Sequence, residues 1–398
     1  MARGFHLGRI AGIDVYLDWS LAIIFTLVTV SLGAGGFPAW HPDWGMLTIW
    51  ATAIAAAVLF LASVLTHEMS HALVGRMHGI EVPQITLFVF GGMAQMREEP
   101  HSWRPELWMA IAGPVTSLVL GGAFIALGML LSAPPPLEGE DPQEFFAALG
   151  PVATLLFWLG PINVILGLFN LVPGFPLDGG RVLRAVLWGA TGDLVRATRW
   201  ASNAGRAFAW LLIGTGFAMA LGVTVPIFGT GLAGGLWLAL IGWFLNNAAV
   251  MSYRQLMLRE SLADVPVSRL MQRAVRTVGP GVSVQSLVDD YVLRAEQRAF
   301  PVVEHDRMLG LVCLRDVYKL PRDEWAATTV ERIMTPADAV AHVAPGDSGA
   351  DAMNELSRRQ VNQLPVVEGG RVAGMLRRED VLRWLSLYGD SRFRNARA

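Results

Sequence analysis

The feature that most restricts the fold of this chain is a series of long apolar runs within its first 255 residues. A helix needs roughly 20 apolar residues to cross a bilayer core about 30 Å thick. The composition agrees with membrane insertion, because 53% of the residues are hydrophobic and only 16% are charged. We therefore predict a polytopic α-helical membrane protein with about six transmembrane helices, near residues 18–35, 46–78, 105–132, 148–171, 204–224 and 230–252.

Arginine is distributed unevenly among the segments that join these runs. The stretches 36–45, 133–147 and 225–229 contain neither Lys nor Arg, whereas the alternate loops contain Arg76, Arg97, Arg104, Arg181, Arg184, Arg196, Arg199 and Arg206. Because positively charged loops stay on the cytoplasmic side, we expect a multi-pass protein of the cell membrane with both termini in the cytoplasm. The formal net charge of -2 gives no indication of a nucleic-acid partner.

A region of different composition begins near residue 256, where charged residues become frequent and the apolar runs shorten to strand length. This region contains an internal repeat: "FPVVE" from Phe300 returns as "LPVVE" from Leu364, and "GLVCLRDV" from Gly310 returns as "GMLRREDV" from Gly374. We predict a membrane domain at 1–255, a linker at 256–264, two α/β domains at 265–320 and 329–388, and a tail at 389–398.

The stretch "LTHEMSHALVGRMHG" places ionisable groups at the end of the second apolar run. His67 and His71 are four residues apart, so on a helix they share one face and can both reach one cation, with Glu68 beside them. Neutral imidazoles are good zinc ligands, and a carboxylate can pass a proton from water at the metal to a leaving amine. Because ionisable groups inside a membrane are costly, we interpret the histidines as ligands of one Zn²⁺ rather than as structural polar residues.

A catalytic zinc ion usually has three protein ligands and one open position, so a third ligand is needed. Cys313 is the only cysteine, which excludes a cysteine-based site. The best candidate lies in "NLVPGFPLDGGRVL", where Pro and Gly residues interrupt the fourth apolar run. Asp178 follows at the expected start of a renewed helix, where it could cap the helix or bind the metal. We favour the ligand role because the two histidines require a third partner.

Taken together, "HEMSH", "FGGMAQM" at Phe90, "AIAGPVTSL" at Ala110 and "NLVPGFPLDGG" at Asn170 resemble the site-2 protease family of intramembrane zinc metalloproteases, over residues 1 to about 255. The resemblance implies that His67, His71 and Asp178 hold the zinc ion and that Glu68 is the general base. It also implies that Asn170 positions the substrate or stabilises the oxyanion at the scissile carbonyl. A helix-packing amide remains the alternative for Asn170.

The stretch "VPQITLFVFGGMAQM" from Val82 is apolar but rich in β-branched and aromatic residues, which is typical of strands. The resemblance suggests a membrane-associated β-hairpin beside the active site. Peptide bonds within a transmembrane helix are shielded, so a substrate must unwind before it is cut. An open strand edge could hold the unwound segment extended through backbone pairing.

The repeat resembles a pair of cystathionine-β-synthase (CBS) domains, on "IMTPADAV" at Ile333 and the repeated "PVVE" followed by a glycine and an aspartate. Such pairs often bind adenine nucleotides, with the closing aspartate on the ribose hydroxyls, a position that Asp316 and Asp380 occupy here. The Thr or Ser usual three residues after the glycine is Cys313 in one copy and Arg377 in the other. The sequence therefore leaves open whether this α/β cytoplasmic domain binds a nucleotide or serves a structural or dimerising role. We also expect a homodimer that forms through the CBS domains.

The resulting interpretation is a protease that cuts single-span membrane proteins, such as membrane-tethered transcriptional regulators or anti-sigma factors, under the control of the CBS pair. A CBS-gated transporter or channel is one alternative, because polar intramembrane residues also mark ion paths. A pseudoprotease that only holds membrane proteins is another. Glu68 argues against the first, since a transport site has no need of it, and the complete set of catalytic residues argues against the second.

Overall fold

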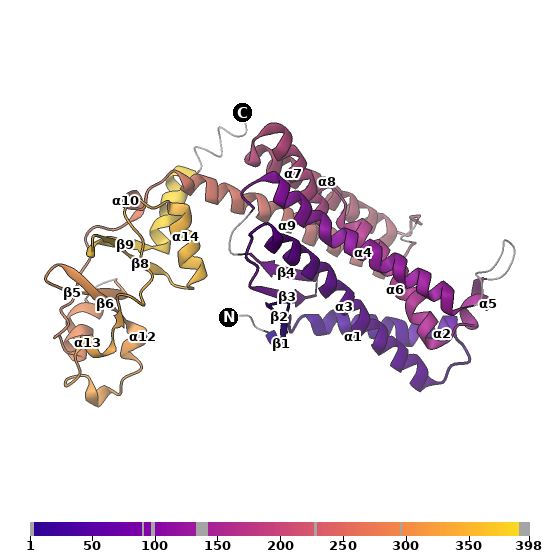
Figure 1. Ribbon diagram of the computed structural model, residues 1–398, viewed down its shortest axis with the longest axis horizontal. Helices are drawn as coiled ribbons and strands as arrows, with labels where there is room; N and C mark the ends of the chain where they lie inside the picture. The colour runs from indigo at the N-terminus through magenta and orange to yellow at the C-terminus, as the bar shows by residue number, and fades with distance from the viewer. Residues whose placement is uncertain are drawn as a thin grey trace. The chain divides into compact units, whose positions relative to one another are not determined.

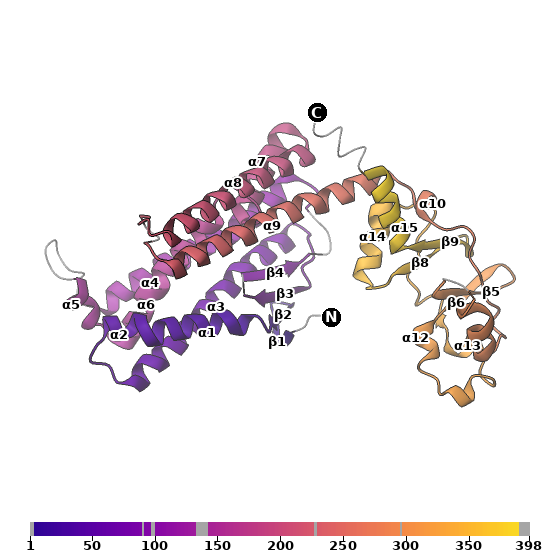
Figure 2. The same cartoon turned by 180° about the vertical axis from the view of Figure 1, so that it is seen from behind.

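The computed structural model describes residues 4–89, 91–96, 100–132, 142–226, 229–294 and 297–389. The chain divides into two compact units, Met1–Tyr253 and Arg254–Ala398, which are described separately below (Figures 1 and 2). The first unit consists of long helices with a small sheet, and the second consists of short strands and helices. The predicted division near residue 255 and this division therefore fall at nearly the same place in the sequence.

Long helices dominate the first unit. Among the described residues, five helical segments are long and apolar enough to cross a membrane: Leu21–Trp40, Met46–Met77, Trp103–Leu131, Pro151–Asn170 and Leu232–Ala263. The first of these comprises α1 (Leu21–Ser31), a π-helical turn (Leu32–Gly36) and α2 (Phe37–Trp40), and the others are α3, α4, α6 and α9. The fifth predicted span, 204–224, falls mainly on α8 (Leu194–Ala220), which is not among these five. The count of six transmembrane helices therefore stays a prediction.

Small residues allow the helices around the centre of the unit to approach closely. A Cβ atom at Gly121 of α4 would lie 2.9 Å from the carbonyl oxygen of Gly160 in α6, and one at Gly167 of α6 would lie 2.9 Å from the carbonyl oxygen of Pro114. Such contacts bring helix backbones together where apolar burial alone provides little driving force within lipid. Two shorter helices, α5 (Pro142–Ala147) and α7 (Asp178–Thr191), complete this unit.

A four-stranded sheet packs against α3, toward the end of the unit that also contains α7 (Figure 1). Its strands follow the order β1 (Gly4–Ile10), β2 (Ile13–Asp18), β3 (Gln84–Phe88) and β4 (Gly91–Gln95). The middle pair is parallel and the outer two pairs are antiparallel. The predicted hairpin is therefore present as β3 and β4, although Phe90 lies outside the described residues, and its association with a membrane stays a prediction.

Buried and partly exposed residues alternate along β2 and β3, so one face of this sheet is buried. Ile13, Val15, Ile85 and Leu87 are all buried, and they form one apolar cluster with residues of α3. Arg76, near the end of α3, adds hydrogen bonds to these contacts. Its guanidinium donates to the carbonyl oxygens at positions 11, 12 and 82, at 2.6, 2.9 and 3.2 Å. The sheet is therefore attached to the same helix that carries the histidine motif.

The second unit repeats one motif. Strands β5 (Ala299–Glu304) and β6 (Arg307–Cys313) pair antiparallel, and β8 (Gln363–Glu368) and β9 (Arg371–Arg377) repeat them 64 residues later. Even the register shift recurs, between Val302 and Val303 and between Val366 and Val367. The remaining elements are α10 (Val267–Leu270), α11 (Val284–Ser286), a π-helical segment (Leu287–Val292), α12 (Leu314–Val317), a 3-10 turn (Arg322–Glu324), α13 (Val330–Ile333), β7 (Thr335–Pro336), α14 (Gly349–Arg358), α15 (Arg378–Trp384) and a second π-helical segment (Leu385–Gly389).

The start of the repeat region contributes to the core of the second copy. Val267 and Leu270 belong to the same buried cluster as Leu364 and Leu376. Gln272 forms a backbone bridge to Met375 of β9. Helix α9 ends at Ala263, so most of the stretch predicted as a linker, 256–264, is helical. Nearly all of the predicted tail, 389–398, lies outside the described residues.

Candidate metal centre

Helix α3 carries His67 and His71 on one buried face. Their four-residue separation places the rings one turn apart, and only 4% and 6% of the two residues is exposed. The two Nε2 atoms lie 3.2 Å apart, with the ring planes nearly perpendicular. Both imidazoles therefore direct the same type of nitrogen atom toward one point.

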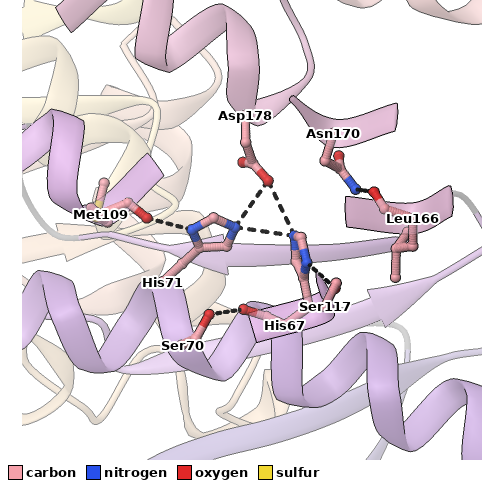
Figure 3. A network of polar contacts seen from close by, with 8 residues as sticks. All are labelled: His67, Ser70, His71, Met109, Ser117, Leu166, Asn170 and Asp178. Atoms are coloured by element: carbon pink, nitrogen blue, oxygen red, sulfur yellow. Dashed lines mark hydrogen bonds and ion pairs between the residues drawn. The ribbon is translucent and has the colours of Figure 1, made fainter. Parts of the chain in front are cut away.

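Asp178, the first residue of α7, meets the histidines from a distant part of the sequence (Figure 3). Its Oδ2 atom lies 3.1 Å from Nε2 of His67 and 3.1 Å from Nε2 of His71. Leu177 occupies the cap position of α7, and the Asp178 carboxylate is directed to the histidines. Among the described residues, these three form the group of His, Cys, Asp and Glu side chains that could hold a metal ion.

The three side chains fit a zinc ion. Bonds of about 2.0–2.1 Å in a tetrahedron give ligand-to-ligand distances of about 3.3 Å, and the separations here are 3.1 and 3.2 Å. Two imidazole nitrogens and one carboxylate oxygen are also a common ligand set of catalytic zinc. Gly113 of α4 leaves room in front of them, because a Cβ atom there would lie 2.2 Å from Nε2 of His71 and 2.6 Å from Nε2 of His67.

Hydrogen bonds from α4 orient both rings. Nδ1 of His71 lies 2.6 Å from the carbonyl oxygen of Met109, which can only accept, so this nitrogen carries the proton. The lone pair of His71 therefore lies on Nε2, which faces Asp178. Nδ1 of His67 lies 2.9 Å from the hydroxyl of Ser117, a fully buried residue. Contacts of this kind fix the orientation of metal-binding histidines and raise their basicity.

Glycines hold the start of α7 against the loop that precedes it. A Cβ atom at Gly179 would lie 2.3 Å from the carbonyl oxygen of Leu171, and one at Gly180 would lie 2.3 Å from the backbone nitrogen of Phe175. No larger side chain could occupy either position without moving the backbone. The two glycines after Asp178 therefore set where the carboxylate emerges.

An ion pair fixes α7 to α4 further along the helix. Nε of Arg184 donates to Oε1 of Glu106 at 2.6 Å, and a second guanidinium nitrogen contacts the same oxygen. Only 1% of Glu106 is exposed. The guanidinium carbon of Arg184 also lies 5.1 Å from the centre of the Phe175 ring. Because one charge of the pair is completely buried, removing either partner would be costly.

Glu68, the predicted general base, lies next to strand β4. It accepts a hydrogen bond from the backbone of Gly92. A Cβ atom at Gly92 would lie 2.2 Å from Cγ and 2.5 Å from Cδ of Glu68. The hairpin and the helix therefore meet at this glycine, which permits the carboxylate to lie against the strand.

Asn170, the last residue of α6, is near the cluster but directed elsewhere. Its Nδ2 donates to the carbonyl oxygen of Leu166, one turn earlier in the same helix, at 3.0 Å (Figure 3). The structure therefore does not bring this amide to the two histidines and Asp178. A role at the scissile carbonyl requires the second N–H of Nδ2 or a different orientation of this side chain.

In the second unit, Asp316 and Asp380 are both buried and both already bonded within the chain. Asp316 accepts from the backbone N–H of Cys313 at 3.0 Å and from Nζ of Lys319 at 2.9 Å. Burial disfavours its charged form, but the hydrogen bonds from Cys313 and Lys319 hold the pKa of Asp316 below its ordinary value. Asp380 accepts from Nε and Nη2 of Arg377 at 2.9 and 3.0 Å. A nucleotide at either aspartate would have to compete with these contacts.

The sequence did not reveal Gly113, Ser117, Glu106 or Arg184 as parts of the site. Gly113 and Ser117 are four residues apart within "AIAGPVTSL", so they share one face of α4. Nothing local indicates that this face contacts the histidines, because the contact depends on how α3 and α4 pack. The pair of Glu106 and Arg184 is likewise visible only once α4 and α7 lie side by side.

Comparison with known proteins gives consistent results for both units. The family model "Peptidase family M50" matches residues 55–212, and "CBS domain" matches 267–323 and 330–387. The zinc metalloprotease Rip3 of Mycobacterium tuberculosis is 35% identical over 98% of this chain and 94% of its own length. The zinc metalloprotease sll0528 of Synechocystis is 32% identical, over 97% and 96%. The solved site-2 protease from Methanocaldococcus jannaschii is 26% identical, covering 63% of this chain and 95% of that chain with a TM-score of 0.40.

Proposed function

Since this chain belongs to peptidase family M50 and is a zinc metalloprotease of the site-2 type, we propose that it hydrolyses peptide bonds within or near the transmembrane segments of other membrane proteins. The observation that carries this proposal is the position of His67, His71 and Asp178. The histidines lie on a helix that is long and apolar enough to cross a bilayer, and the aspartate meets them between helices. A hydrolytic site on a helix of this kind suits a substrate that is itself embedded in the membrane.

The proposed reaction assigns one role to each group. His67, His71 and Asp178 hold the zinc ion, which when bound supplies a Lewis acid for the scissile carbonyl. Glu68 accepts the proton of the attacking water and delivers it to the leaving nitrogen. Met109 and Ser117 keep the imidazoles oriented through their Nδ1 atoms. Asn170 is proposed to donate an amide N–H to the developing oxyanion.

Strand β4 is proposed to hold the substrate. It is the outer strand of the sheet, so one of its edges has no partner strand among the described residues. An unwound segment that pairs with this edge would run past Gly92, whose backbone contacts Glu68. The proposed pairing therefore brings an extended peptide bond toward the general base.

We propose that the substrates are single-span proteins, such as membrane-tethered transcriptional regulators or anti-sigma factors, whose cleavage releases a cytosolic fragment. The enzyme would then lie in the cell membrane with both termini in the cytoplasm. We further propose that the CBS pair regulates cleavage in response to an adenine nucleotide and supports a homodimer. Saturating ATP, ADP or AMP should then bind the full chain and change its cleavage rate, and the absence of both effects would contradict nucleotide control.

The transporter alternative is not supported by the relatives, which are named zinc metalloproteases. The test of the proposed function is cleavage of a panel of single-span proteins by the purified full chain, with zinc content measured in parallel. We expect about one zinc ion per chain and specific cleavage that stops on chelation and returns with zinc. Zinc-loaded protein that cleaves no member of the panel, but retains membrane proteins on a column, would favour a pseudoprotease instead.

A further inference from the structure

His41 is a buried ionisable residue that plays no part in the proposed protease mechanism. It lies between α2 and α3, outside the apolar helical segments, and only 1% of it is exposed. Helices α2 and α5 lie at the end of the first unit away from the sheet and α7 (Figures 1 and 2). Helix α3 begins at Met46, so His67 lies about 30 Å along it, at about 1.5 Å per residue. His41 and the metal centre are therefore at opposite ends of this helix.

Three contacts hold His41 in place. Its Nε2 lies 2.8 Å from Oγ1 of Thr154, a completely buried residue near the start of α6. Its ring stacks on that of Trp44, with the ring centres 3.7 Å apart and the planes 6° from parallel. Its backbone N–H donates to the carbonyl oxygen of Phe37 in α2 at 2.8 Å. The side chain therefore joins the segment 41–45, which connects α2 to α3, to the start of α6.

This packing suits a neutral imidazole. The Nδ1 atom is buried and has no hydrogen-bond partner among the described residues. A charged imidazole donates from both nitrogens, so it would bury one N–H without an acceptor. Burial lowers the pKa of His41 below its ordinary value, and the backbone of Ala147 opposes this effect only in part. The face of Trp44 also favours a cation, but a contact of this kind is small beside the cost of burying a charge.

No acidic side chain among the described residues compensates the charge of a protonated ring. The segment 41–45 contains Asp43 and α5 contains Glu144, whereas α2, α6 and the first turns of α3 contain no charged residue. Both acids are exposed, and neither affects the pKa of His41. The ring therefore takes up a proton more readily in water, where the pKa of histidine is about 6.5, than in this packing.

We propose that His41 is an acid-sensitive switch, in which a proton taken up by its ring releases the segment 41–45 from Thr154 and the start of α6. The attached form is fully favoured above the ordinary histidine pKa of about 6.5. This preference is lost as the pH falls below that value toward the lower pKa of the attached form. With the orientation proposed above, this end of the unit faces away from the cytoplasm, so the switch responds to acid outside the cell. It acts at the start of α3 and α6, the helices that carry His67 and Asn170.

The experiment measures amide hydrogen exchange of the full-length protein in detergent micelles at about pH 7.5 and about pH 5, with rates corrected for the intrinsic effect of pH. In the wild type, we expect the protection of peptides from 37–45 and 150–156 to fall about 10-fold at the lower pH, since one pKa unit corresponds to a factor of ten. The amide of His41→Gln can still reach Thr154 but does not titrate in this range. This variant should therefore keep equal protection at both pH values.

The matched control is His78→Gln. His78 is exposed at the other end of α3, where its Nδ1 contacts the carbonyl oxygen of Val74 at 2.9 Å. This control should show the same fall in protection as the wild type. Acid can also release zinc from its histidine ligands, but that effect is common to all three proteins. The proposal fails if the wild type keeps its protection at the lower pH, or if His41→Gln loses protection as the wild type does.

A second measurement needs no variant and serves if His41→Gln does not fold, as judged by zinc content and thermal unfolding. Exchange of the C2 hydrogen of the His41 ring, followed by mass spectrometry across a pH series, reports the pKa of this residue directly. We expect a midpoint below about 6.5 in the wild type, and a midpoint at or above that value would overturn the proposal. Neither measurement uses cleavage, so failure of the switch is distinguishable from failure of the proposed protease function.

Discussion

Gly113 faces His71 so closely that a methyl group on its Cα would lie 2.2 Å from the Nε2 atom. The same methyl group would lie 2.6 Å from Nε2 of His67. It would therefore occupy the space in which an ion bound by both histidines must sit. We expect Gly113→Ala to weaken zinc binding on the order of 100-fold, the upper end of what the loss of a supporting residue costs a metal site.

Zinc titration of the purified variant tests this expectation. Gly122→Ala is the matched control, because Gly122 lies on the same helix and a Cβ atom there has nothing within 4 Å. The control should bind zinc like the wild type. Equal zinc affinity in Gly113→Ala and the wild type would mean that the ion does not lie between the histidines and α4.

Ser117→Ala tests how the ring of His67 is oriented. The variant removes the hydroxyl that lies 2.9 Å from Nδ1, so the imidazole loses the hydrogen bond that holds its orientation. We expect zinc affinity to fall by about 10- to 100-fold, the usual cost of losing such a contact. Ser252→Ala provides the control, because that hydroxyl only donates to Ala248 of its own helix. An unchanged zinc affinity in Ser117→Ala would show that the hydroxyl is not needed.

Glu106→Gln tests the ion pair that joins α4 to α7. The change leaves Arg184 without its charged partner, and breaking a buried pair from one side costs about 3–5 kcal/mol of stability. Because α7 begins with Asp178, we expect zinc affinity to fall together with the melting temperature. Glu106→Met combined with Arg184→Met removes both charges and should recover much of the melting temperature. No loss of either quantity in Glu106→Gln would show that the pair does not hold α7.

Asp316→Asn should destabilise the first CBS copy in a pH-dependent manner. Cys313 and Lys319 hold the pKa of Asp316 below its ordinary value, so its carboxylate stabilises the fold above the unfolded pKa of about 3.9. That contribution is lost as the pH falls through the lower folded pKa. Hydrogen exchange of peptides from 299–320 should therefore be faster in the variant at pH 7 and should approach that of the wild type near pH 3. An equal difference at both pH values would contradict this role of the charge.

Local spacing predicted the parts of the site that lie within single elements. The four-residue interval predicted that His67 and His71 would share a face, and the interrupted run before Asp178 predicted a new helix start, which the structure places at that residue. Spacing could not reveal Gly113, Ser117 and Glu106, because their contacts arise where α4 packs on other helices. It also could not show that Asn170 would donate to its own helix.

The fold was predictable to a similar extent. The repeat in the sequence anticipated the two matching strand pairs, because each pair is encoded by its own alternation and turn. The placement of Val267 in the core of the second copy was not predictable, since that contact joins segments about 100 residues apart. The fifth predicted span, 204–224, contains Arg206 and falls mainly on α8, which is not among the five described helical segments long and apolar enough to cross a membrane.

The most direct test of the central claim compares Glu68→Gln with the wild type. Zinc content and cleavage of one single-span substrate are measured on the same preparations. We expect the variant to retain one zinc ion per chain and to lose cleavage by about 10²- to 10⁴-fold, the contribution typical of a general base. Cleavage at the wild-type rate by zinc-loaded Glu68→Gln would contradict the proposed mechanism.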